Sequence, residues 1–140
     1  MSIILGKPQV RGKSDVLFNY DVSADIAAGT AVKRTGETSV AQFDGAGIPF
    51  GIAGYVDLKG QKTIAVCEAG KSIGVLLDNP NETITAGSQV FLTENGKATQ
   101  ISTDNTPTGA IFVSAKSDGI NVLTDQVEGQ AALIDMIGGL

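Results

Sequence analysis

The fold is decided by the stretch Ile26-Ala27-Ala28-Gly29-Thr30-Ala31-Val32, which returns 58 residues later as Ile84-Thr85-Ala86-Gly87-Ser88-Gln89-Val90. In each copy Ala-Gly predicts a tight turn, because glycine adopts backbone dihedrals that other residues avoid. The residues that follow then enter a strand whose valine points into the core. Gly51 and Gly109 keep the same offset. The repeat predicts two similar β units at about 26–83 and 84–140, with chance similarity in a Gly-rich and Ala-rich chain as the alternative.

Short apolar runs bounded by turn residues continue this pattern along the chain. The expected strands are Val16–Tyr20, Ala31–Lys33, Val40–Gln42, Phe50–Val56, Lys62–Cys67, Ser72–Leu77, Val90–Thr93, Ala98–Ile101, Gly109–Ser114 and Ile120–Leu123. Between them, Asp-Gly and Asn-Gly pairs supply the positive φ that tight hairpins need; the expected turns include Asp44-Gly45, Asn95-Gly96 and Asp118-Gly119. So many short strands favour an all-β barrel or sandwich.

Helical signals are weak. Ala24–Ala28 is long enough for a single helical turn. Gln130–Ile137 has apolar residues at helical spacing, but the segment is short and flanked by glycine. We therefore interpret Gln130–Ile137 as a closing strand.

The composition indicates one folded domain with an uneven charge. Apolar residues make up 42% of the 140 residues and charged residues 18%, which is typical of a globular chain. The net charge is −5, yet residues 1–14 carry Lys7, Arg11 and Lys13 and no acid. The sequence thus predicts a short extended N-terminal arm, 1–14, ahead of an acidic single domain, 15–140. The arm is either a solvated tail or a segment that docks on an acidic partner. Direct nucleic-acid binding is disfavoured because it relies on a basic face.

The single cysteine and the absence of long apolar stretches bear on where the protein works. Cys67 has no second cysteine with which to form an intramolecular disulfide. No stretch approaches the ~18 apolar residues of a membrane helix, and residues 1–10 lack the apolar core of a signal peptide. We expect a soluble protein made in the cytoplasm, with no membrane partner.

Residue types and spacing argue against catalysis. The chain has no histidine, which removes the commonest general base and most catalytic zinc sites. Gly70-Lys71-Ser72 matches the last three residues of a phosphate-binding loop motif, but Ala65 stands where that motif needs glycine. We therefore interpret Gly70-Lys71-Ser72 as a turn. Asp78 and Glu82 flank a proline-containing turn, and turn formation alone accounts for carboxylates at these positions without a catalytic role. Cys67 alternates with apolar neighbours and is typical of packing. We expect no enzyme activity, no cofactor and no metal.

The order of the weaker motifs carries a resemblance. After the first A-G unit come Gly51-Ile52-Ala53-Gly54-Tyr55, Glu68-Ala69-Gly70, the second unit with Asn95-Gly96-Lys97-Ala98-Thr99, Thr108-Gly109-Ala110-Ile111 and Ala131-Ala132-Leu133-Ile134-Asp135-Met136. From about Val16 to its end the chain resembles the small capsid cement, or decoration, proteins of tailed bacteriophages. The resemblance implies a compact β-barrel or β-tulip-like domain of short antiparallel strands. It also implies homotrimers on the outer surface of the major capsid protein lattice, which clamp the virion head against the pressure of packaged DNA. Cement proteins carry no catalytic residues and no cofactor.

Two segments are candidate capsid contacts. The first is the basic arm with Lys7, Arg11 and Lys13. The second is the glycine-rich loop at Phe43–Pro49, because an apolar tip has little reason to face water; its candidate contacts are Phe43, Ile48 and, just beyond it, Phe50. Another virion component, such as a head-fibre base or a minor tail protein, and a soluble carbohydrate-binding β module remain as alternatives. An enzyme is the third alternative.

Overall fold

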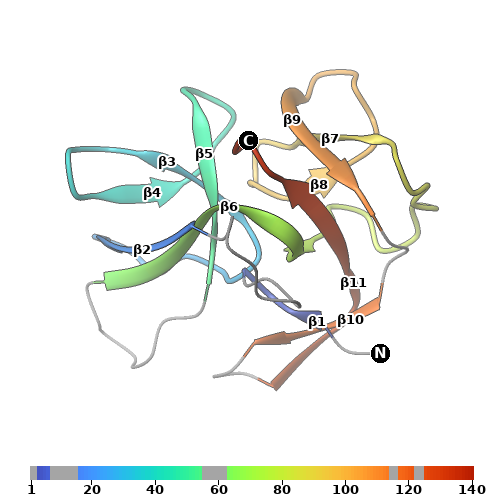
Figure 1. Cartoon of the computed structure of the whole chain (residues 1–140), viewed down its shortest axis with the longest axis horizontal. Coiled ribbons are helices and arrows are strands. Elements are labelled where there is room, and N and C mark those ends of the chain that lie inside the picture. The colour runs from blue at the N-terminus through green and yellow to red at the C-terminus, as the bar shows by residue number, and fades with distance from the viewer. Residues whose placement is uncertain (1–2, 7–15, 55–62, 114–116, 122–124) are drawn as a thin grey trace.

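The structure is a computed structural model that describes residues 3–6, 16–54, 63–113, 117–121 and 125–140 (Figure 1). These residues form strands and no helix, which confirms the predicted all-β fold. The strands are β1 (Ile3–Ile4), β2 (Val16–Asp21), β3 (Ala31–Arg34), β4 (Val40–Gln42), β5 (Pro49–Ala53), β6 (Thr63–Leu76), β7 (Gln89–Leu92), β8 (Ala98–Thr99), β9 (Thr106–Phe112), β10 (Ser117–Asn121) and β11 (Asp125–Met136).

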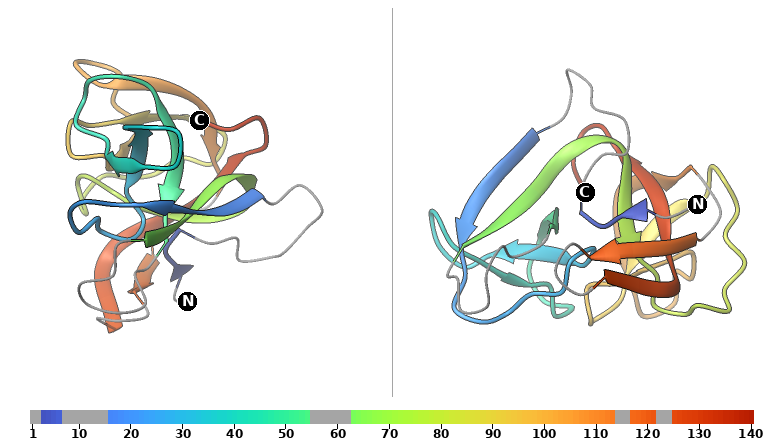
Figure 2. Two further views of the ribbon diagram at one scale, coloured as in Figure 1. Left: turned by 90° about the vertical axis from the view of Figure 1, so that its left-hand side faces the viewer. Right: turned by 90° about the horizontal axis from the view of Figure 1, so that it is seen from below.

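The strands join into one curled sheet in the order β4-β3-β5-β6-β11-β9-β7-β8. Neighbours along this path are antiparallel, while β2 pairs with β6, and β10 pairs with β11. The long strand β6 lies at the centre and bends as it passes from one side of the molecule to the other (Figure 2). The result is a compact, barrel-like arrangement with β6 shared by both sides.

Three local predictions need correction. The chain does not turn at Ala69–Ser72; the two strands expected there are the single strand β6, in which Gly70 (φ 147°) and Ser72 (φ 55°) produce a bend. Ser72 holds its unusual conformation because its N–H donates to Asp135 Oδ1 at 2.8 Å. Asp118-Gly119 is likewise not a turn but an irregular part of β10. Ala24–Ala28 is not helical, whereas the closing strand expected at Gln130–Ile137 is confirmed by β11.

Strand pairing shows the same order twice. We call β2, β3, β4, β5 and residues 63–69 the first unit, and residues 70–76, β7, β8, β9 and β11 the second unit. The first unit has the order β4-β3-β5-β6-β2, and the second has β8-β7-β9-β11-β6. The registers match as well, since Arg34 pairs with Val40 as Leu92 pairs with Ala98, and Lys33 pairs with Pro49 as Phe91 pairs with Pro107. Corresponding residues in these four pairs are 58 positions apart.

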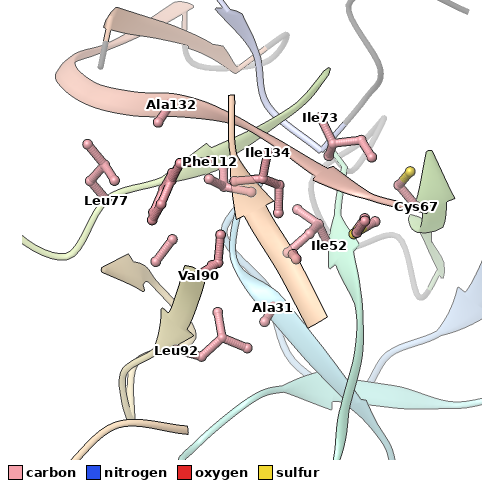
Figure 3. Packing of buried hydrophobic residues seen from close by; sticks show 14 of the residues in the cluster. Ala31, Ile52, Cys67, Ile73, Leu77, Val90, Leu92, Phe112, Ala132 and Ile134 are labelled. Atoms are coloured by element: carbon pink, nitrogen blue, oxygen red, sulfur yellow. The ribbon is translucent and has the colours of Figure 1, made fainter. Parts of the chain in front are cut away.

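The two units differ in how their cores are closed. The first unit encloses a small cluster that includes Tyr20, Ile64 and Val66. The second unit encloses a larger cluster, and four residues of the first unit are part of it (Figure 3). These four buried residues are Ala31, Phe43, Ile52 and Cys67. The first unit therefore acts as one wall of the second unit's core.

The beginning of the chain packs against both units. Strand β1 runs parallel to β10, and the N–H of Gly6 donates to the Gly74 carbonyl at 2.8 Å. Leu5 is 1% exposed and lies in a third cluster with Ala28 and Leu76. Residues 3–5 of the expected arm thus pair with other strands and form part of the sheet, and the chain turns at Gly6.

Candidate contact surfaces

The loop between β4 and β5 is braced by one lysine. Lys33 Nζ lies 2.8 Å from Asp44 Oδ1 and 3.4 Å from the carbonyl oxygen of Ala46. The same Asp44 oxygen accepts the N–H of Ala46 at 3.1 Å, and Gly45 and Gly47 adopt φ values of 92° and 85°. The hydrogen bond from Lys33 and that from the Ala46 backbone lower the pKa of Asp44. These contacts connect Lys33 of β3 to the loop.

Ile48 projects from this braced loop. Its side chain is 81% exposed, the most of any large hydrophobic residue that the structure describes. The next residue, Pro49, is buried and begins β5. A large apolar side chain is therefore exposed to solvent on a short loop, and Ile48 remains a candidate contact.

Phe43 is not available as a contact, which corrects the prediction that placed it on the surface. It is 1% exposed and belongs to the large core cluster. Its N–H donates to the Ala31 carbonyl at 2.9 Å, and the N–H of Ala31 donates to Gly96 in the second unit at 2.8 Å. The Asn95-Gly96 turn of the second unit covers this position, and no local sequence signal predicts that contact.

Phe50 is half-buried and belongs to a cluster of four side chains that we call the Tyr20 cluster: Tyr20, Arg34, Phe50 and Glu68. The Tyr20 and Phe50 rings meet edge to face at 5.4 Å, and the Arg34 guanidinium lies 5.2 Å from one ring centre and 5.1 Å from the other. Tyr20 donates its hydroxyl to Glu68 Oε2 at 2.6 Å. Burial, followed by this hydrogen bond, raises the pKa of Tyr20.

Sequence reasoning missed the other three members of the Tyr20 cluster because they lie on three strands that are distant in sequence. Alternation along Val16–Tyr20 was the signal that could have placed Tyr20 on the inner face. Tyrosine and arginine are enriched among the residues that dominate protein interfaces. In the Tyr20 cluster, the exposed Arg34 and the half-buried Phe50 are therefore the candidate contact residues.

Lys7, Arg11 and Lys13 lie outside the described residues. Their positions relative to Ile48 and Phe50 are therefore not part of the described structure. These three residues remain candidate contacts on the strength of the sequence alone.

A polar groove of about 410 Å³ lies in the second unit. Glu82, the partner of Asp78 in the carboxylate pair considered above, is not among its lining residues. Instead the Glu82 carboxylate accepts hydrogen bonds from the Thr99 hydroxyl at 2.8 Å and from the Gln100 N–H at 2.7 Å. Glu82 thus ties its loop to β8. The groove is lined by Asp78, Asn79, Thr93, Glu94, Asn95, Thr99, Ile101, Asp104 and Asn105.

The remaining chemical candidates have structural roles. Cys67 is buried in the large core cluster, and Gly70-Lys71-Ser72 lies within β6. In the described part of the chain no three His, Cys, Asp or Glu side chains gather closely enough to hold a metal ion. Nor do the described residues include a helix that is long and apolar enough to cross a membrane.

No protein-family model matches the chain, and a search of curated proteins finds no match. The candidate surfaces must therefore be judged on their geometry.

Proposed function

We propose that this protein is a non-enzymatic capsid decoration protein that binds the outer surface of a major capsid protein lattice and stabilises the virion head. The observation that carries the proposal is Ile48, an isoleucine 81% exposed on a loop that Lys33 and Asp44 hold in place. An apolar side chain on a constrained loop loses little conformational entropy when a partner buries it. Such a residue suits a docking site in a pocket of a neighbouring subunit.

A decoration protein acts through binding alone. By binding the assembled lattice and not the free subunits, it stabilises the lattice by RT ln(1 + [L]/Kd). A homotrimer would present three Ile48 loops to a three-fold position, so that weak contacts multiply through effective concentration. The proposed trimer on the outside of the head, with no cofactor and no nucleic-acid contact, follows from the ordered motifs together with this surface.

The test is co-sedimentation with purified phage heads that lack this protein. The wild-type chain should sediment with the heads in saturable amounts. Ile48→Asp should weaken binding at least about tenfold, since it places a charge in an apolar contact. Ile137→Asp is the matched control, because Ile137 is 52% exposed at the end of β11 and should bind as the wild type does. A wild-type chain that stays in the supernatant rules out the function, and an Ile48→Asp variant that binds normally rules out the loop.

The basic arm needs its own variant. Deletion of residues 2–14 would remove Leu5, which is buried in the body of the protein. Substituting alanine for Lys7, Arg11 and Lys13 together tests the arm and leaves Leu5 in place. If the arm docks on an acidic capsid subunit, this variant binds less tightly, and the loss shrinks as salt is raised.

A further inference from the structure

The outer face of the first unit is buried within the chain. Ala31 pairs with Ile52, and Ile52 pairs with Cys67, so these three side chains lie side by side on one face of the sheet. Each is at most 1% exposed, as is Phe43 beside them. Together they cover the core of the second unit (Figure 3).

The corresponding face of the second unit is uncovered. Gln89 pairs with Ile111, and Ile111 pairs with Asp135, which repeats the arrangement of Ala31, Ile52 and Cys67. Ile101, which stands 58 residues after Phe43, lines the polar groove instead. By strand pairing Ile111 takes the place of Ile52, although it stands 59 residues after it, because the β7–β9 register shifts between Gln89 and Phe91. Ile111 is 42% exposed, whereas Ile52 is buried. We call Gln89, Ile111 and Asp135 the second outer face.

In the core of the first unit, positions that are buried in the core of the second unit are exposed to solvent. Phe18 pairs with Val66 as Ile73 pairs with Ile134, yet Phe18 is 58% exposed and Ile73 is fully buried. Arg34 is exposed where its counterpart 58 residues later, Leu92, is 1% exposed. We call Phe18, Arg34 and the half-buried Phe50 the open core.

We propose that a second copy of this chain covers the open core, with the second outer face of one copy packing on the open core of the next. The contact repeats the one that already joins the two units inside each chain. Ile111 would meet the aromatic side chains of the open core. The carboxylate of Asp135, fixed by the Ser72 N–H at 2.8 Å, is opposite in charge to Arg34.

This contact joins two different surfaces, so it is heterologous and builds a ring when the rotation closes. In the trimer of the proposed function, six units would repeat one contact, three times within chains and three times between them. The inference rests on the proposed function for the number of copies only. The contact itself is argued from the repeated strand pairs and their unequal burial.

Sedimentation velocity of the purified chain provides the test. Wild type should sediment as an oligomer at micromolar concentration, whereas Ile111→Arg and Phe18→Arg should each sediment as a monomer. Asn81→Arg, at an exposed residue of the loop between β6 and β7 that belongs to neither surface, should stay oligomeric. All three substituted side chains are solvent-exposed in the isolated chain, so unchanged circular dichroism and thermal unfolding will verify that each variant folds.

A mixing experiment distinguishes a head-to-tail contact from a symmetric one. Ile111→Arg keeps an intact open core, and Phe18→Arg keeps an intact second outer face. An equimolar mixture should therefore form a dimer through the one intact pair of surfaces, although neither variant associates alone. A wild-type monomer, an oligomeric Ile111→Arg or Phe18→Arg variant, or a mixture that stays monomeric overturns the inference.

Head binding separates this inference from the proposed function. Ile48→Asp should remain oligomeric but bind heads less tightly. Ile111→Arg should be a monomer and should also bind heads less tightly, because a monomer makes a single contact with the lattice. A wild-type chain that binds heads as a monomer contradicts the head-to-tail contact and leaves decoration intact. An oligomer that does not bind heads contradicts decoration and leaves the contact intact.

Discussion

Thr30 and Ser88, 58 residues apart, make the same hydrogen bond: each donates its side-chain hydroxyl to the carbonyl oxygen three residues earlier. Thr30 reaches Ala27 at 2.7 Å, and Ser88 reaches Thr85 at 2.6 Å. The turns share a conformation but not an environment. Thr30 is fully buried, whereas Ser88 is partly exposed, because the first turn is covered by the second unit and by Leu5. This difference makes the repeat testable by paired substitutions.

Removing the two hydroxyls should therefore have unequal effects. Thr30→Val keeps the shape of a buried side chain but deletes its hydrogen bond, at a cost of about 1 kcal/mol in the free energy of unfolding. Ser88→Ala should cost less than about 0.5 kcal/mol, although its hydroxyl also lies 2.7 Å from Gln100 Oε1, because water can reach these partly exposed partners. Urea unfolding of both variants measures the difference. Equal losses would show that the two turns are not packed differently.

Gly51 and Gly109 stand 58 residues apart but have different surroundings, since Gly51 is buried and Gly109 is exposed. A Cβ at Gly51 would lie 2.5 Å from Val66 Cγ1 and 2.9 Å from the Cys67 carbonyl oxygen, so Gly51→Ala should cost roughly 1–3 kcal/mol through overpacking. At Gly109 the nearest atom is 4.0 Å away, and Gly109→Ala should stay within about 0.5 kcal/mol of wild type. Thermal or urea unfolding measures the loss of stability in each variant. A Gly51→Ala variant as stable as the wild type would contradict the close approach of Gly51 to β6.

The pKa of Asp44 should report the brace on the Ile48 loop. The hydrogen bond from Lys33 is the largest cause of its lowered pKa, so Lys33→Met should return the Asp44 pKa toward the ordinary ~3.9. A lowered folded-state pKa contributes stability above ~3.9, and the contribution is lost as pH falls through the folded value. The brace is thus intact at neutral pH. Carboxyl NMR titration of both proteins measures the change. If the Asp44 pKa is the same in Lys33→Met as in the wild type, the Lys33 hydrogen bond does not lower it.

The pKa of Tyr20 tests the Tyr20 cluster. Burial and the hydrogen bond to Glu68 raise it, so Glu68→Gln should bring the Tyr20 pKa down toward the ordinary value of about 10. A raised folded-state pKa contributes stability below about pH 10 that is lost as pH rises through the folded value. Spectroscopic titration in a Tyr55→Phe background isolates Tyr20, because the chain has two tyrosines. A Tyr20 pKa that Glu68→Gln leaves unchanged would mean that the hydrogen bond to Glu68 contributes little.

Local signals in the sequence predict most of the strands. Val40–Gln42 matches β4 in both bounds, and the A-G turns precede β3 and β7 as expected. These predictions succeed because turn chemistry and alternation act over a few residues. The expected turn at Gly70 fails for a non-local reason. Asp135, on a strand 63 positions further along, binds the Ser72 N–H and lets β6 continue through a bend.

The candidate contact residues also divide into one whose exposure local signals predict and one whose burial they do not predict. Ile48 was identifiable because its loop is short, rich in glycine and apolar at its tip. Phe43, five residues earlier in the same loop, has the same local signal, yet it is buried because the Asn95-Gly96 turn packs against its neighbours. Sequence spacing alone does not tell which of the two repeated units is covered by the other, and that difference decides which apolar residues reach the surface.

The central claim is that this chain decorates the outside of a phage head through the Ile48 loop. Electron microscopy of heads incubated with the purified chain tests it most directly. We predict added density on the outer surface at three-fold or quasi-three-fold positions, with the loop at residues 44–48 facing the capsid lattice. Heads that remain bare at saturating protein would contradict the claim.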